Sequence, residues 1–335
     1  MIAIAGCGNI ARLHAKLLRP HTDLYFYSKN FESADRFNRK YKGAGTFGSF
    51  EALLKDARIK GVVLCTPPDA HRSQVESALE AGKYVLCEKP LCVRSEDLVA
   101  LSKIQTGRLM IAENYYYKPA LKTLKSWLKI PSLGQIKRIR IGKRSEQIPL
   151  NWKSSYGALL EGGIHFVAFL NSLLEGHDFK ITSSLFPRVA SGRPERTSVL
   201  TFQVGARAEA ELSYSWEEAH LLKGLFQRSQ IECENGSIYF ENNGLYGKLI
   251  TPIDNKRFLA LKDPMGYNAQ AEDFLRWINS EGARAPLSHF ANAKKDLEII
   301  FEAYKMGGLT EQGALGGLAT YEHPGSVHSG HSGQP

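Results

Sequence analysis

The 335-residue chain lacks any apolar run near the roughly 20 residues that a membrane-spanning helix requires. Its start, MIAIAGCGNIARLHAK, also lacks the basic n-region and the uninterrupted apolar stretch of a signal peptide. Nothing in the sequence therefore points to a membrane or to secretion. We expect a cytoplasmic protein that binds no membrane.

Cysteine is scarce, with five residues and no Cys-x-x-Cys pair. An odd and scattered set provides neither a disulfide framework nor the ligand spacing of a zinc site. Cys65 and Cys87 lie in apolar runs, where buried and reduced thiols are typical. We therefore expect free cysteines and no metal.

Basic tracts are also missing, although lysine and arginine give the chain a formal net charge of +9. The basic residues are scattered through helical and strand patterns alike, with no arginine-rich segment or basic arm. Such a distribution favours an anionic cofactor or a small-molecule substrate. We do not expect a nucleic-acid partner.

The first third of the chain alternates short apolar runs with amphipathic helical segments. Continuous apolar strands separated by helices are typical of a parallel sheet that is covered on both faces. The predicted strands are residues 2–6, 23–27, 61–66, 84–87 and 108–114.

The second half has a different pattern. Residues 206–216 alternate strictly between apolar and polar side chains, and residues 229–234 and 237–241 form a hairpin pattern joined by Asn235-Gly236. Strands of this kind have one covered and one open face, which indicates an antiparallel sheet. Two amphipathic helices are predicted after it, near residues 268–279 and 292–305.

The stretch GCGNIA, residues 6–11, follows the first strand and opens the first helix. In this G-x-G-x-x-A pattern the first glycine makes a tight turn, the second lets the backbone approach a pyrophosphate, and the alanine lets the helix pack closely. The helix N-terminus then faces the phosphates. We expect a dinucleotide-binding loop formed by Gly6, Gly8, Asn9 and Ile10.

The end of the second strand suggests which dinucleotide is bound. NAD-binding proteins place a carboxylate about 20 residues after the loop, against the ribose hydroxyls. This chain has Ser28 and Lys29 in that region, and no carboxylate before Glu32. A hydroxyl and a cation suit the 2′-phosphate of NADP, so NADP is favoured over NAD. The alternative is that Lys29 is a solvated loop lysine.

Conspicuous residues follow three further strands, in the segments TPPDAH, EKP and AENYYYKP. In open parallel sheets, ligands bind at the carboxyl edge of the strands. Two consecutive prolines make a rigid turn that can flank a nicotinamide, whereas the histidine after them is either a ligand contact or a helix-opening residue. The candidate cofactor contacts are Thr66, Pro67, Pro68, His71, Glu88, Lys89 and Asn114.

Within YGALLEGGIHFVAFL, Glu161 and His165 are four residues apart. On a helix they share a face, so the carboxylate can orient the imidazole. The alternative for His165 is a satisfied histidine on a buried helix.

These motifs together resemble the glucose–fructose oxidoreductase / inositol dehydrogenase / MocA family over about residues 1–310. GCGNIA, TPPDAH, CEKPL, ENYYYKP and Trp152 followed by GALLEGGIH occur in the family's order. The resemblance implies an α/β protein with an NAD(P)-binding Rossmann domain, residues 1–117, and a substrate and oligomerisation domain, residues 118–320. The second domain would carry an open, mainly antiparallel sheet that mediates a homodimer or homotetramer. Residues 321–335 have the low-complexity composition of a disordered tail.

The family's activity implies hydride transfer between NADP or NAD and a carbinol or carbonyl carbon of a sugar, cyclitol or derivative. The family's catalytic lysine corresponds to Lys89, and its Asp-x-x-x-His pair corresponds to Glu161 and His165, with Glu in place of Asp. Tyr116 stands where many relatives have arginine. The resemblance thus implies substrate contacts from Lys89, Tyr116, Trp152 and His165, and it leaves open whether His165 or one of Tyr115, Tyr116, Tyr117 and Tyr156 exchanges the proton.

Two other functions occur among such relatives. One is NAD-assisted glycoside hydrolysis, and the other is a catalytically idle protein that senses nucleotide and binds partners. Because Lys89 and His165 are both present, the idle protein is disfavoured.

Overall fold

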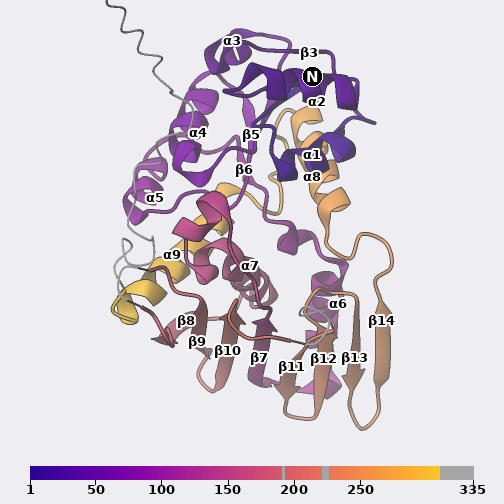
Figure 1. The fold of residues 1–335 in the computed structure, drawn as a ribbon. Helices are drawn as coiled ribbons and strands as arrows, with labels where there is room; N and C mark the ends of the chain where they lie inside the picture. Colours follow the sequence, from indigo (N-terminus) through magenta and orange to yellow (C-terminus); the bar gives the residue numbers. More distant parts are fainter. Residues whose placement is uncertain (191–192, 221–225, 310–335) are drawn as a thin grey trace, which may run out of the picture.

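The computed structural model describes residues 1–190, 193–220 and 226–309. Two β-sheets lie one above the other, and helices pack around the first and between the two (Figure 1). The described residues include no helix that is long and apolar enough to cross a bilayer. The predicted tail, residues 321–335, lies outside the described residues.

The first sheet has the strand order β3-β2-β1-β4-β5-β6, and all its neighbouring strands pair in parallel. This is the order of a doubly wound dinucleotide-binding fold. The parallel sheet expected from the sequence is therefore confirmed. Its strands are β1 (Ile2–Ala5), β2 (Leu24–Tyr27), β3 (Gly45–Thr46), β4 (Gly61–Leu64), β5 (Tyr84–Cys87) and β6 (Leu109–Ile111).

Alternate residues of β1, β2, β4, β5 and β6 enter different hydrophobic clusters. In β1, Ala3 and Ala5 belong to one cluster, and Ile2 and Ile4 belong to the other. Both faces of this sheet are thus covered, which explains why its strands are apolar throughout. The covering helices from this part of the chain are α1 (Asn9–Leu18), α2 (Phe31–Tyr41), α3 (Phe50–Lys55), α4 (His71–Glu80) and α5 (Ser95–Leu101).

The second sheet has the order β14-β13-β12-β11-β7-β10-β9-β8, and its pairs are antiparallel except β7 with β10. In β10, Ala210 and Leu212 are buried while Glu209 and Glu211 are exposed, so one face is open as predicted. Its strands are β7 (Ile136–Arg144), β8 (Phe179–Leu185), β9 (Thr197–Val204), β10 (Ala208–Ser215), β11 (Arg228–Cys233), β12 (Gly236–Glu241), β13 (Tyr246–Ile250) and β14 (Asn255–Leu259).

The predicted hairpin is present, with a turn one residue earlier than expected. Gly236 pairs with Cys233 inside the β11–β12 ladder, so Glu234 and Asn235 form the connection. The Asn-Gly signal located the turn correctly but did not fix its register.

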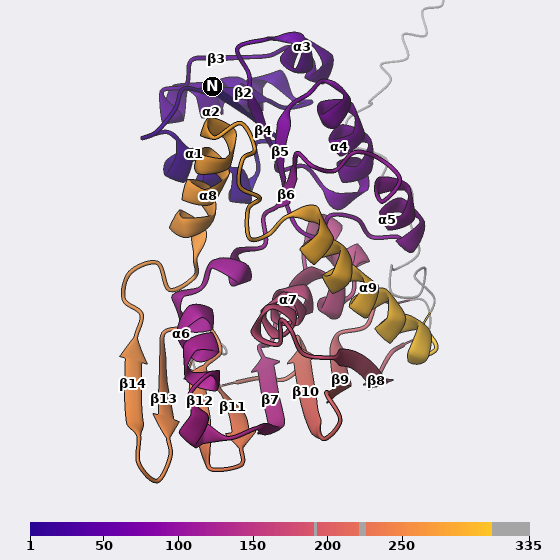
Figure 2. The same cartoon turned by 180° about the vertical axis from the view of Figure 1, so that it is seen from behind.

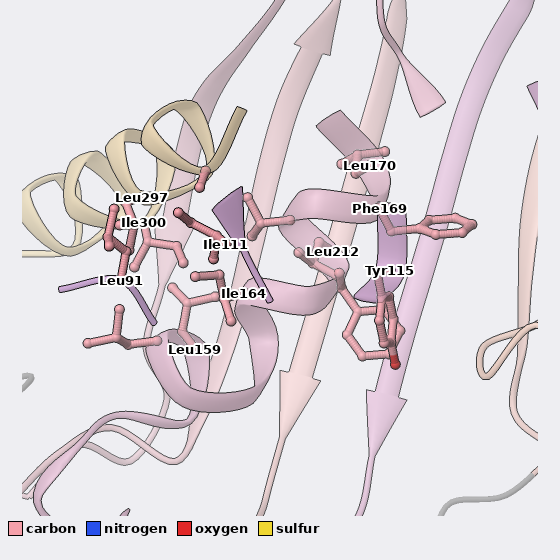
Figure 3. Close-up of a cluster of buried hydrophobic side chains, with 14 of the residues drawn as sticks. Leu91, Ile111, Tyr115, Leu159, Ile164, Phe169, Leu170, Leu212, Leu297 and Ile300 are labelled. Carbon is pink, nitrogen blue, oxygen red and sulfur yellow. The ribbon is translucent and has the colours of Figure 1, made fainter. Parts of the chain in front are cut away.

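Helix α7 (Ile164–Leu173) lies over the covered face of the second sheet and packs against α9 (Phe290–Met306) (Figures 1 and 2). Short helical turns complete this region: η1 (Pro68–Ala70), η2 (Asn114–Tyr117), η3 (Pro131–Leu133), η4 (Asn151–Ser155) and the π-helix η5 (Leu159–Gly163). Figure 3 shows the core that results, with Ile111, Tyr115, Leu159, Ile164, Phe169, Leu170, Leu212, Leu297 and Ile300 gathered around α7.

Helix α6 (Pro119–Leu128) lies beside the second sheet, whereas α8 (Tyr267–Asn279) returns to the first sheet and packs beside α1 (Figures 1 and 2). Phe274 and Trp277 enter the cluster that covers Ile2 and Ile4. The late segment of the chain is therefore part of the core of the first sheet.

The turn that opens α8 is pressed against η2. Gly266 has a φ of 80°, and a Cβ added there would lie 2.7 Å from the Asn114 carbonyl oxygen and 2.7 Å from the Tyr117 carbonyl carbon. Glycine is therefore required for two reasons. The positive φ disfavours other residues, and the backbone atoms of η2 cannot move aside as a flexible side chain can.

We predict that Gly266→Ala lowers the free energy of unfolding by about 3 kcal/mol or more, because it combines an unfavourable φ with overpacking. Gly176→Ala is the matched control, since Gly176 has a φ of 86° and open space around the added Cβ. That control should cost about 1 kcal/mol, the conformational cost alone. Urea denaturation measures both, and equal losses would contradict the close contact with η2.

Candidate functional site

The predicted phosphate loop lies between β1 and α1. Gly6 has a φ of 94°, and a Cβ added there would come within 2.6 Å of the Cys65 carbonyl oxygen. The loop is thus pressed against the end of β4, and only glycine fits. A Cβ added at Gly8 would meet no atom within 4 Å, so the backbone there faces open space.

The start of α1 has the properties of an anion site. Its N-cap, Gly8, provides no side-chain acceptor, and its first turn has no acidic residue. The first amides of the helix therefore lack the side-chain partner that usually satisfies them, and the helix dipole adds positive potential. The phosphates of a dinucleotide fit this arrangement.

Ser28 lies half-buried directly after β2, and Lys29 is exposed beside it. Arg36 lies on α2, where its Nη2 donates to the Ser33 hydroxyl at 2.9 Å. Burial raises the pKa of the Cys7 thiol to about 11, and the Arg36 charge opposes that rise. Arg36 is therefore close enough to the phosphate loop to act on it electrostatically, which was not foreseen from the sequence.

The segment after β4 is held by its own side chains. Thr66 donates from its hydroxyl to Gln74 Oε1 at 2.6 Å, Pro67 is exposed, and Pro68 is buried. His71 is 0% exposed, and its two ring nitrogens lie 2.9 Å from the carbonyl oxygens of Pro90 and Thr66. A direct cofactor contact by His71 is therefore contradicted, because the ring ties two loops together instead.

The segment after β5 brings two charged residues to the same edge of the sheet. Glu88 Oε1 lies 2.7 Å from His14 Nε2 of α1, and Glu88 Oε2 accepts from the Lys89 amide at 3.2 Å. Glu88 thus connects the first helix to the backbone of the lysine. The Lys89–Pro90 peptide is cis.

The Lys89 side chain reaches the π-helix η5. Its Nζ donates to the Glu161 carbonyl oxygen at 2.5 Å and lies 3.4 Å from Glu161 Oε1. Lys153 donates to the same Oε1 at 2.5 Å. Burial alone raises the pKa of the Glu161 carboxyl, but the charges of Lys89, Lys153 and His165 outweigh it and lower the pKa to about 2.

His165 is oriented by a carboxylate other than the predicted one. Its Nδ1 lies 2.8 Å from Glu113 Oε1 and 2.9 Å from Glu113 Oε2. Glu113 also accepts from the Tyr115 amide at 3.0 Å. Burial raises the pKa of the Glu113 carboxyl, but His165, the Tyr115 amide and Lys89 together lower it below its ordinary value.

The prediction that Glu161 orients His165 is therefore wrong, and the reason is local. Glu161 belongs to the π-helix, and His165 is in the first turn of the α-helix that follows. The wider π turn breaks the i, i+4 alignment on which the prediction depended. Gly162 lies inside this turn, where an added Cβ would come into contact with the Tyr214 hydroxyl.

Two further predicted contacts are contradicted. Asn114 is 1% exposed, and its side-chain amide donates to the Met265 carbonyl oxygen at 2.7 Å. The Tyr116 hydroxyl donates to buried Asp296 at 2.7 Å. Neither side chain is available to a cofactor or a substrate, because each connects η2 to a later helix or turn.

The other tyrosines also have distinct places. Tyr117 donates to Asp273 at 2.9 Å, and Tyr156 donates to Asp69 at 2.8 Å. The Tyr115 ring stacks on the His165 ring, with centroids 4.8 Å apart and planes at 17°. Trp152 lies in η4, and its side chain is outside the described part of the structure.

The site therefore brings together Lys89, Glu161, His165 and Glu113, at the carboxyl edge of β5 and β6. Glu113 and Lys153 were missed in the sequence. Glu113 lies at the carboxyl end of the predicted strand 108–114, the same kind of position that drew attention to Lys89. Across the described ranges, no group of three or more histidines, cysteines or acids could hold a metal ion, and none of the five cysteines, all of which are described, forms a disulfide.

Comparison with known proteins agrees with the dinucleotide-binding fold of the first sheet. Residues 1–110 match the glucose–fructose oxidoreductase / inositol dehydrogenase / MocA model, described as an oxidoreductase family with an NAD-binding Rossmann fold. Residues 1–110 thus belong to this oxidoreductase family. The resemblance noted in the sequence is confirmed.

The chain is 29% identical over 180 residues to trans-1,2-dihydrobenzene-1,2-diol dehydrogenase of Sus scrofa, a match covering 52% of this chain and 54% of that protein. It thus spans about half the length of that relative. Inositol 2-dehydrogenase of Rhizobium meliloti is 25% identical, over 71% of this chain and 74% of that protein. An oxidoreductase of Agrobacterium radiobacter, solved with NAD⁺, L-tartaric acid and magnesium, shares the fold with a TM-score of 0.80 at 17% identity, over 92% of this chain and 96% of that one.

We predict that Glu113→Gln moves the titration midpoint of the His165 ring down by about one pH unit, because a neutral amide no longer stabilises the imidazolium. Glu161→Gln is the control and should move the midpoint less, since its carboxylate is held by two lysines. Histidine NMR, assigned with His165→Asn, measures both variants. A larger effect from Glu161→Gln would restore the pairing expected from the sequence.

Proposed function

We propose that this protein is an NAD(P)-dependent oxidoreductase that acts on a carbinol or carbonyl carbon of a sugar, cyclitol or related derivative. The observation that carries the proposal is the meeting of Lys89 and the Glu113–His165 pair at the carboxyl edge of a dinucleotide-binding sheet. Ligands of open parallel sheets bind at this edge. The relatives named above are a diol dehydrogenase and an inositol dehydrogenase, which supports a polyol or its keto form as substrate.

His165 exchanges the proton of the substrate hydroxyl in this proposal. Glu113 accepts from Nδ1 and thereby holds the proton there, which leaves Nε2 as the nitrogen that takes or gives the proton. The structure records no hydrogen bond for Nε2 among the described residues. When bound, the nicotinamide ring supplies or accepts the hydride.

Lys89 donates a hydrogen bond to the reacting oxygen and stabilises the negative charge that develops on it. The Glu161 carbonyl and carboxylate of the π-helix accept from its ammonium and hold it in place. Glu161 thus positions Lys89 rather than His165, and Lys153 binds the same carboxylate. Trp152 stays a predicted substrate contact.

We also propose that the cofactor is NADP in preference to NAD. Ser28 and Lys29 at the end of β2 are joined by Arg36 of α2, whose charge acts on Cys7 of the phosphate loop. A hydroxyl and two cations suit a 2′-phosphate, and a guanidinium binds phosphate with two parallel hydrogen bonds. Gly6, Gly8, Asn9 and Ile10 would hold the pyrophosphate, and Thr66, Pro67, Pro68 and Glu88 would line the nicotinamide end.

The proposed activity is tested with Lys89→Met, assayed on sugars, cyclitols and their keto forms with both cofactors. We expect turnover to fall about 100-fold or more, the usual scale for a lost proton-transfer or oxyanion group, while cofactor binding stays nearly unchanged. Lys153→Met removes the neighbouring partner of the same carboxylate and should cost far less. Turnover within a few-fold of the parent would make Lys89 a structural lysine, and glycoside cleavage without net cofactor turnover would favour the hydrolytic alternative.

The cofactor preference is tested by fluorescence titration with NADPH and NADH. We expect tighter binding of NADPH, and a loss of about tenfold to a hundredfold in that affinity for Arg36→Ala with NADH binding unchanged, since one charged phosphate contact is worth about 1.5–3 kcal/mol. Arg39→Ala is the matched control, because Arg39 lies on the same helix but pairs with Asp35 at 3.0 Å. Equal affinity for the two cofactors in the parent would refute the preference.

The open face of the second sheet supports a homodimer or homotetramer in a cytoplasmic protein. Exposed Glu209 and Glu211 of β10 lie in register with exposed Arg138 and Arg140 of β7. Adjacent acidic and basic rows are complementary to a second copy of the same surface turned around. Sedimentation of the purified protein tests this, and a monomer at micromolar concentration would contradict it.

A further inference from the structure

Lys118 is a buried cation close to the proposed site but outside the proposed chemistry. It is 1% exposed and directly precedes α6. Its Nζ donates to the carbonyl oxygens of Asn242 at 3.3 Å and Asn243 at 3.0 Å. No carboxylate of the described residues forms an ion pair with it, which is unusual for a buried lysine.

The Lys118 ammonium also lies over the Tyr115 ring, with Nζ 3.5 Å from the ring centroid. The same ring stacks on His165 at 4.8 Å, so one aromatic ring contacts both the lysine and the imidazole. The two charges are consequently at most about 8 Å apart, inside the protein where screening by water and salt is weak.

Other charged groups surround the two ends of this stack. Around His165 are Glu113 from the end of β6, Glu161 from η5, and Lys89 from the end of β5, whose charge lowers the pKa of both acids. Around Lys118 are Glu241 at the end of β12, Glu113 again, and Lys143 of β7. Burial lowers the pKa of Lys118 to about 7, while Glu241 and Glu113 oppose that change and Lys143 adds to it. Lys118 is thus charged in the acidic range in which a histidine titrates.

We propose that Lys118 is a positioning residue that sets the proton affinity of His165 through the shared Tyr115 ring. Its positive charge disfavours the imidazolium and thereby balances Glu113, which favours it. Its contact with the ring also holds Tyr115 flat against the imidazole. This inference rests on the proposed function in one respect, which is the assignment of proton exchange to His165.

Three substitutions separate charge from structure. Lys118→Met removes the charge, and Lys118→Gln removes the charge but retains an amide that can donate to the Asn242 and Asn243 carbonyls. Lys118→Arg retains the charge. We expect the titration midpoint of the His165 ring, measured by histidine NMR, to rise by about half a unit to one pH unit in both neutral variants. The arginine variant should restore the parent midpoint.

An unchanged midpoint in a folded neutral variant would overturn the proposal. Failure of both neutral variants to fold, with a stable arginine variant, would also overturn it by making the lysine purely structural. The pH dependence of kcat is measured in parallel. If the NMR midpoint moves and the acidic limb of kcat does not, the coupling holds and His165 is not the proton-exchanging group of the proposed function.

Discussion

Two buried carboxylates determine how the two halves of this protein meet. Glu113 and Glu161 are 2% and 7% exposed, and ionised groups at such depth are tolerated only with charged and hydrogen-bonded partners. Glu113 takes His165 as its partner, and Glu161 takes Lys89 and Lys153. Each acid therefore holds a side chain from a distant segment of the chain, His165 for Glu113 and Lys89 for Glu161. The requirement to neutralise buried charge thus assembles the proposed reacting groups at one edge of the first sheet.

Much of this arrangement could be predicted because strand ends are visible in the sequence. Apolar runs that stop at Gly6, at Thr66 and at Glu88 identify the carboxyl edge of a parallel sheet, and the structure places all three there. The partner of His165 could not be predicted in the same way. The i, i+4 spacing of Glu161 assumes a regular α-helix, whereas a π-helix is set by tertiary packing around Gly162.

The run of three tyrosines shows a second limit of sequence reasoning. Tyr115, Tyr116 and Tyr117 cannot be distinguished in the sequence, but each side chain has a different partner in the structure. One stacks on His165, and the other two donate to Asp296 and Asp273, acids more than 150 residues away in the chain. Partners at such separation leave no local pattern, so the role of a buried polar side chain becomes evident only when its acceptor is known.

The return of α8 to the first sheet has a consequence for the order in which the chain folds. Phe274 and Trp277 cover the face formed by Ile2 and Ile4, and Gly61 of β4 leaves room for Ile278. A nascent chain that ends before residue 267 would carry the whole parallel sheet with one apolar face incompletely covered. Pairing the first strand with a helix more than 260 residues later is slow and exposes that face in the meantime. The first sheet is therefore fully covered only after α8 has been synthesised, although all of its own strands precede residue 112.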